Sequence, residues 1–175
     1  MKTQKGFSLI ELLIVVVIIG IIAAIAIPNL LAARRSANEG SAISTLRTYH
    51  GAQMTYQASI GAGDFAGVYG VSNPFVVLAR AGIMDKTFDA ANIGDDSVKS
   101  GYIFDGWMHA RTASAPAQFN GHGNPTTTSG ATQTGSRTFG IMTNGVMLSA
   151  PSGTGAGFSN AGATDTITGL TPMAN

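Results

Sequence analysis

The sequence has no cysteine and few charged residues. Without cysteine the chain forms no disulfide, so its segments must be held by packing, hydrogen bonds or neighbouring molecules. Charged side chains make up 11% of the 175 residues and leave a formal net charge of +1, which gives no sign of nucleic-acid binding. At this length there is room for one domain, or for one small domain on a long anchor.

The sequence also lacks a recognisable catalytic arrangement. His50, His109 and His122 show no metal-ligand spacing, and no serine lies in a strand–turn–helix elbow. We therefore expect neither enzyme activity nor a cofactor.

What the sequence does have is a long apolar run near its start. From Phe7 to Ile27 there are 21 residues, of which only Ser8 and Glu11 are polar. A helix of this length, at about 1.5 Å per residue, matches the roughly 30 Å hydrocarbon core of a bilayer. The run therefore predicts a membrane-spanning helix.

Glu11 is unusual in such a run, because a carboxylate in an apolar span is costly and suggests a function. The preceding residues are short and basic through Lys2 and Lys5, as in a secretory signal, and Ala24 to Ala26 could imitate a signal cleavage site. The run is longer than a signal peptide requires, and it contains an acid. An ordinary signal peptide is therefore the weaker interpretation.

The motif Gly6-Phe7-Ser8-Leu9-Ile10-Glu11 resembles the processing motif of type IV pilins and type II secretion pseudopilins. The resemblance implies that a prepilin peptidase cuts between Gly6 and Phe7 and N-methylates Phe7. It also implies that the helix stays on the protein and becomes the core of a filament. Many pilins staple their C-terminal region with a disulfide, and this sequence departs from that pattern. The resemblance is strong for residues 1 to about 35 and only architectural beyond.

The motif has a physical rationale. Cleavage creates an α-amino group on Phe7, four positions before Glu11, and two opposite charges buried together in an apolar core offset each other's desolvation. Removing Lys2 and Lys5 lowers the 10 basic side chains to 8, against 9 acidic ones. Gly20 and Pro28 bracket a segment whose backbone is easily loosened, so we expect a kink or local melting there.

Residues 29 to 60 predict a continuation of the same helix, now amphipathic. One face carries a stripe at spacings of three and four, which should pack on a sheet: Ala42, Leu46, Tyr49, Gln53, Tyr56 and Ile60. We interpret Tyr49 and Tyr56 as core aromatics rather than as a path for charge along a filament.

After a glycine-rich loop, a cap at Ser72 or Asn73, Pro74 and Gly82 predict a short helix from about 74 to 81. Residues 85 to 100 read as polar loop. Four acids in this loop are a weak calcium candidate, because their spacing does not match a known calcium loop, although some pseudopilins bind calcium in this part of the chain: Asp85, Asp89, Asp95 and Asp96.

Residues 101 to 111 predict a strand, and residues 112 to 136 a long polar loop. Asn144-Gly145 between two apolar runs predicts a two-residue hairpin turn. Its expected pairs place Thr143 opposite Val146, Ile141 opposite Leu148 and Phe139 opposite Ala150. The face that carries these three pairs is the expected core face.

The hydroxyl-rich segments 112–136 and 149–171 bury little and should lie on the outside. No Asn-x-Ser/Thr acceptor is present, so a glycan would be O-linked, with these candidate sites among others: Thr126, Thr127, Thr128 and Ser129.

Together these features predict an α+β fold, with one long N-terminal helix on an antiparallel sheet of three or four strands. The expected segments are a cleaved leader (1–6), an apolar helix (7–28), an amphipathic half (29–60) and a sheet head (61–175). The resemblance implies a pilin that waits in the inner membrane. Its expected partners are prepilin peptidase, the inner-membrane assembly machinery and further copies of itself in an extracellular helical filament. The alternatives are a pseudopilin and a membrane-anchored binding module that does not polymerise.

Overall fold

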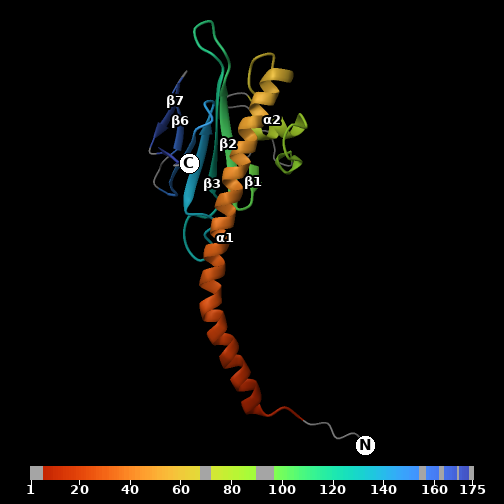
Figure 1. Cartoon of the computed structure of the whole chain (residues 1–175), viewed down its shortest axis with the longest axis vertical. Helices are drawn as coiled ribbons and strands as arrows, with labels where there is room; N and C mark the ends of the chain where they lie inside the picture. The colour runs from red at the N-terminus through yellow and green to blue at the C-terminus, as the bar shows by residue number, and fades with distance from the viewer. Residues whose placement is uncertain are drawn as a thin grey trace, which may run out of the picture. The chain divides into compact units, whose positions relative to one another are not determined.

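The computed structural model describes residues 6–67, 72–89, 97–153, 157–161, 164–168 and 170–173, and the fold is α+β as predicted. The chain divides into two compact units, Met1–Arg34 and Arg35–Asn175. One helix, α1 (Leu9–Ser59), runs through both units. Within the second unit, Figure 1 shows α1 lying along a sheet.

The helix α1 is continuous through Gly20 and Pro28. Neither residue breaks the helix in this structure. The kink or local melting expected at these residues stays a prediction. The predicted stripe is confirmed where it meets the sheet, since Ala42, Leu46 and Tyr49 are buried. Gln53 is also fully buried.

The end of the stripe was predicted wrongly. Ile60 is 57% exposed, because the helix stops at Ser59. The chain then turns away through two residues with positive φ, Ala62 and Gly63.

The main sheet has six antiparallel strands in the order β1-β2-β3-β4-β5-β8, rather than the three or four expected. A separate hairpin pairs β6 with β7. The strands are β1 (Ser97–Lys99), β2 (Tyr102–His109), β3 (Gln118–Pro125), β4 (Arg137–Met142), β5 (Met147–Pro151), β6 (Gly157–Ala161), β7 (Thr164–Thr168) and β8 (Thr171–Pro172).

The prediction of an unbroken loop over 112–136 is wrong, because β3 lies inside it and pairs with both β2 and β4. The alternation of apolar and polar residues that marks a strand is hidden in the sequence of β3, because two of its inward positions are glycines, Gly121 and Gly123. A Cβ on Gly121 would lie 2.5 Å from the Tyr49 ring, and one on Gly123 would lie 3.0 Å from the Phe104 ring. Aromatic rings from elsewhere thus fill the space that side chains of β3 would otherwise take.

The short helix α2 (Pro74–Arg80) confirms the prediction for 74–81. Asn73 is its cap, since the Asn73 side chain accepts a hydrogen bond from the Phe75 amide at 3.0 Å. Gly82 has a φ of +72°, the left-handed conformation expected just past a helix end. The predicted polar loop over 85–100 is wrong in part, because it contains the 3₁₀ helix η1 (Lys86–Phe88) and strand β1.

The predicted hairpin of β4 and β5 exists, but its register is shifted by one residue. Ile141 pairs with Met147, and Gly140 pairs with Leu148. Only Gly145 has positive φ in the turn, and its amide donates to the Met142 carbonyl at 2.8 Å. Four residues, 143–146, lie between the two strands instead of the two expected.

The cause of the shift is that Thr143 is tied to β3. Its hydroxyl accepts from the Phe119 amide at 2.8 Å and donates to the Phe119 carbonyl at 2.9 Å. A shift of one residue moves side chains to the other face. Phe139 and Ile141 therefore join the core under α1, whereas Leu148 and Ala150 are buried outside that cluster.

Aromatic rings form the centre of the core. Tyr49 stacks on Phe75 with ring centroids 4.1 Å apart, and its hydroxyl donates to the Asn120 carbonyl at 2.9 Å. Gln53 holds the backbone of Ala66 by two hydrogen bonds, one as donor and one as acceptor. The amphipathic half of α1 thus supplies the cover of the sheet, as predicted.

Candidate processing and assembly segment

The first unit is an exposed apolar helix. Every large apolar side chain from Phe7 to Leu30 is more than half exposed in the single chain. By length and composition α1 is able to cross a membrane, and it is the one such helix in the part of the chain described. Water does not favour so much exposed apolar surface, so this segment needs a bilayer or other copies around it.

The carboxylate of Glu11 caps the start of this helix. Its Oε2 accepts a hydrogen bond from the Ser8 amide at 2.8 Å. Ser8 and Glu11 have the spacing of a capping box, in which an acid at the third helical position reaches back to the cap residue. The sequence contained this signal, and our prediction for Glu11 did not use it. In the uncleaved chain Glu11 therefore already has a partner.

Gly6 and Gly20 are not required by packing within the chain. A Cβ at either position would meet no neighbouring atom within 4 Å, apart from the helix's own backbone in the case of Gly20, and neither glycine has positive φ. Phe7 is 83% exposed beside Gly6. The Gly6–Phe7 bond is therefore accessible, and any requirement for glycine there comes from another molecule.

The structure does not bring the calcium candidates together. Asp85 accepts from Lys99 Nζ at 2.8 Å and Asp89 accepts from Arg80 Nε at 3.0 Å. The hydrogen bonds from Lys99 and Thr87 hold the pKa of Asp85 well below its usual range. Asp95 and Asp96 lie outside the described residues. Among the residues that are described, no group of three His, Asp or Glu side chains is placed to bind a metal ion.

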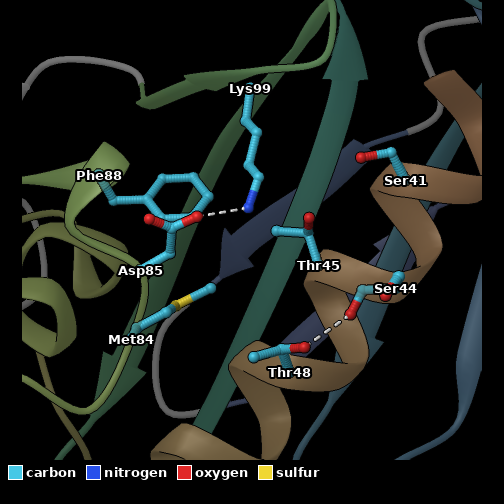
Figure 2. Close-up of a pocket in the computed structure, with 8 residues that line it drawn as sticks. All are labelled: Ser41, Ser44, Thr45, Thr48, Met84, Asp85, Phe88 and Lys99. Carbon is cyan, nitrogen blue, oxygen red and sulfur yellow. Dashed lines mark hydrogen bonds and ion pairs between the residues drawn. The ribbon is translucent and has the colours of Figure 1, made fainter.

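Asp85 lines a pocket of about 180 Å³. Figure 2 shows the side chains around it. Hydroxyl side chains of α1 line one wall, and the Asp85–Lys99 ion pair lies opposite them. The Lys99 ammonium also lies 5.4 Å from the centre of the Phe88 ring. The pocket is lined by Ser41, Ser44, Thr45, Thr48, Met84, Asp85, Phe88 and Lys99.

The four glycosylation candidates differ in their surroundings. The Thr126 hydroxyl donates to the Gly101 carbonyl at 3.1 Å, and Thr127 is half-buried. Thr128 and Ser129 are exposed, and among the described residues neither hydroxyl has a hydrogen-bond partner. Thr126 is exposed too, so what distinguishes Thr128 and Ser129 is that their hydroxyls are both exposed and unbonded.

Glu39 is a charged site that sequence reasoning missed. It is buried on α1, and its Oε1 accepts from the Ser136 amide at 2.8 Å and from the Ser136 hydroxyl at 2.7 Å. Its Oε2 accepts from Arg137 Nε at 3.0 Å and lies 2.9 Å from Arg137 Nη2. Burial raises the pKa of Glu39, but the hydrogen bonds from Ser136 and Arg137 together outweigh it and hold the pKa below its usual value.

Comparison with known proteins supports the interpretation of the first unit. A family model described as the prokaryotic N-terminal methylation motif matches residues 1–27. The chain is 67% identical over 39 residues to the type IV wide pilus major component PilA4 of Thermus thermophilus, covering 22% of this chain and 30% of that protein.

Two further relatives show the same pattern. Identity to the type IV major pilin protein PilA of Myxococcus xanthus is 46% over 53 residues, covering 30% of this chain and 24% of that protein. Identity to the type II secretion system core protein G of Klebsiella pneumoniae is 35% over 57 residues, covering 33% and 41%.

The chain thus spans less than half the length of each of these relatives, and no solved structure matches it. The resemblance predicted from Gly6 to Glu11 is confirmed: residues 1–27 carry the prokaryotic N-terminal methylation motif, and the similarity to type IV pilins and type II secretion core proteins covers a third of the chain or less.

Proposed function

We propose that the chain is a structural subunit of an extracellular filament, a type IV pilin, and not an enzyme. The observation that carries the proposal is α1 itself. Its exposed apolar half lies within the residues that match the methylation-motif model, 1–27, and its second half is part of a folded head. A helix built this way suits a subunit that moves from a bilayer into the apolar centre of a filament.

The proposed pathway has three stages. The precursor lies in the inner membrane, held by the apolar half of α1. Prepilin peptidase cuts after Gly6 and methylates Phe7, and the inner-membrane assembly machinery then adds the subunit to a helical homopolymer. On assembly the apolar side chains of α1 leave the lipid and pack against neighbouring helices. Their apolar surface therefore stays away from water at every stage.

Purified surface filaments test this proposal. Filaments sheared from cells should contain this chain as their main subunit when the subunit is identified by mass. Cells that make the protein abundantly and display filaments without it would contradict the proposal.

A pseudopilin of a type II secretion system is the alternative, supported by the similarity to core protein G of Klebsiella pneumoniae. A pseudopilus is short and needs fewer copies than a surface fibre. Deleting the gene should then block export of a secreted protein without removing surface filaments. A membrane-anchored module that does not polymerise would show neither effect, and it would need Glu11 only as the cap of α1.

A further inference from the structure

Polar side chains of α1 make the first contacts between this helix and the segment that precedes β4. Arg35 Nη1 donates to Gln133 Oε1 at 3.3 Å, and Asn38 Nδ2 donates to the Thr134 carbonyl at 2.9 Å. Glu39 follows with its bonds to Ser136 and Arg137. These three helix residues thus bind one continuous segment, 133–137, that leads into β4.

Apolar packing begins only after these contacts. The first core residue of α1 is Ala42, followed by the partly buried Ile43 and the fully buried Leu46. From there to Gln53 the helix is fixed by buried rings and by the Tyr49–Asn120 hydrogen bond. Residues 35–41 therefore depend on hydrogen bonds, which contribute less than the burial that secures the rest.

We propose that Arg35, Asn38 and Glu39 form a polar latch that opens as a unit, ahead of the apolar core, when Glu39 loses its charge. Opening would free seven residues, 35–41, or roughly 10 Å of helix at 1.5 Å per residue. The latch would thus set how far along α1 the sheet is attached. This inference does not depend on the proposed filament.

Three charged or titratable groups surround Glu39, and of these Arg137 favours its ionised form. Arg137 contacts it from β4, Arg35 lies one turn earlier on α1, and the Tyr102 phenol lies nearby on β2, donating to the Arg137 carbonyl at 2.8 Å. Since the folded-state pKa of Glu39 is lowered from 4.5, its contribution is present above pH 4.5. This contribution is lost as the pH falls below that value, through the folded-state pKa.

Hydrogen exchange on the full chain in detergent micelles tests the latch. The Ser136 amide donates to Glu39, so peptides covering 133–137 report on opening. In Glu39→Gln and Glu39→Ala, exchange in this segment should be roughly tenfold faster at neutral pH, as expected for loss of a charged hydrogen-bond acceptor. Exchange in β2 should stay close to that of the unchanged chain.

Asp85→Asn is the matched control, because it removes a carboxylate of another ion pair and should leave 133–137 unchanged. In the unchanged chain, exchange at 133–137, corrected for its intrinsic pH dependence, should also rise below pH 4.5, and in Glu39→Gln this rise should be absent. Equal acceleration in β2 and 133–137 would overturn the proposal, since Glu39 would then stabilise the whole fold. No acceleration in either variant would overturn it as well.

Discussion

Glu11 has one partner in the uncleaved chain and is proposed to gain another on maturation. It now accepts the Ser8 amide at the start of α1. After cleavage a charged amine on Phe7 would lie one helical turn away. Both interactions give the carboxylate a partner, so the residue suits the precursor and the filament alike.

Processing is predicted at Gly6. The mature protein should lack Met1 to Gly6 and carry one methyl group on Phe7, as measured by intact mass. Gly6→Leu should leave unprocessed precursor in the membrane, because the side chain meets nothing in the chain itself and is excluded only by the peptidase. Gly40→Ala, at another open glycine, is the control and should be processed normally. A mature terminus at Ile27 would instead indicate an ordinary signal peptide.

The charge of Glu11 is predicted to be necessary for assembly. Glu11→Gln and Glu11→Ala should both be inserted and cleaved but yield few filaments, since removing one member of a buried ion pair costs about 3–5 kcal/mol. Glutamine keeps an oxygen that accepts the Ser8 amide, so this variant separates the charge from the cap. Sheared filament protein gives the yield, and a normal yield in Glu11→Gln would show that the charge is dispensable.

An O-linked glycan, if present, is predicted at Thr128 or Ser129, whose hydroxyls are exposed and without described partners. Peptide mass spectra of filament protein should show added hexose mass on the peptide that contains them. Thr128→Ala with Ser129→Ala should remove it, whereas Thr126→Ala should not, since that hydroxyl is bound to Gly101. Spectra with only unmodified peptides would exclude the glycan.

At the scale of elements, local signals predicted what local contacts determine. The helix α2 was predicted because Asn73, Pro74 and Gly82 lie within a few residues of one another. Strand β3 was missed because its glycines are explained only by rings far along the chain, such as Tyr49 above Gly121. The hairpin register failed for the same reason, since Thr143 is held by Phe119 on another strand.

In the candidate site, too, local features were predicted from the sequence and long-range contacts were not. Gly6 to Glu11 form a continuous motif and were identified from the sequence, whereas Glu39 resembled any acid on an amphipathic helix. Its partners, Ser136 and Arg137, lie 97 and 98 residues further along. No pattern within the helix predicts which distant segment comes to rest against it.

The contact between α1 and β3 is predicted to be sensitive to a single methyl group. Gly121→Ala places a Cβ 2.5 Å from the Tyr49 ring, and the stacking of Tyr49 on Phe75 leaves the ring little room to move. Overpacking of this kind costs about 1–3 kcal/mol. Thermal unfolding of the full chain in detergent should show a lower midpoint. Gly51→Ala, on the exposed side of α1, should not lower it; equal midpoints for both variants would show that Tyr49 is not tightly packed.

At the scale of the whole molecule, the two units have opposite requirements, and truncation should separate them. A chain beginning at Asn29 loses the apolar run and keeps Leu46, Tyr49 and Gln53. It should be a folded, soluble monomer, because the removed surface is what requires lipid or other copies.

A chain beginning at Gly61 should fail to fold, because the sheet face with Phe119, Phe139 and Ile141 loses its cover. Each large side chain left in water forfeits roughly 1.5–3 kcal/mol, which in sum is comparable with the stability of a small domain. Circular dichroism and size exclusion of both truncated chains decide the matter. A well-folded chain from Gly61 would place the core elsewhere.

The helix α1 and the strand that it packs against lie far apart in the sequence, and this has a consequence during synthesis of the chain. Tyr49 binds Asn120, 71 residues later in the chain. At about 5–20 residues per second, a ribosome needs roughly 4–14 s to make the intervening segment. During that interval the newborn helix displays its apolar stripe with no sheet to cover it, so for several seconds each new molecule depends on whatever receives it at the membrane.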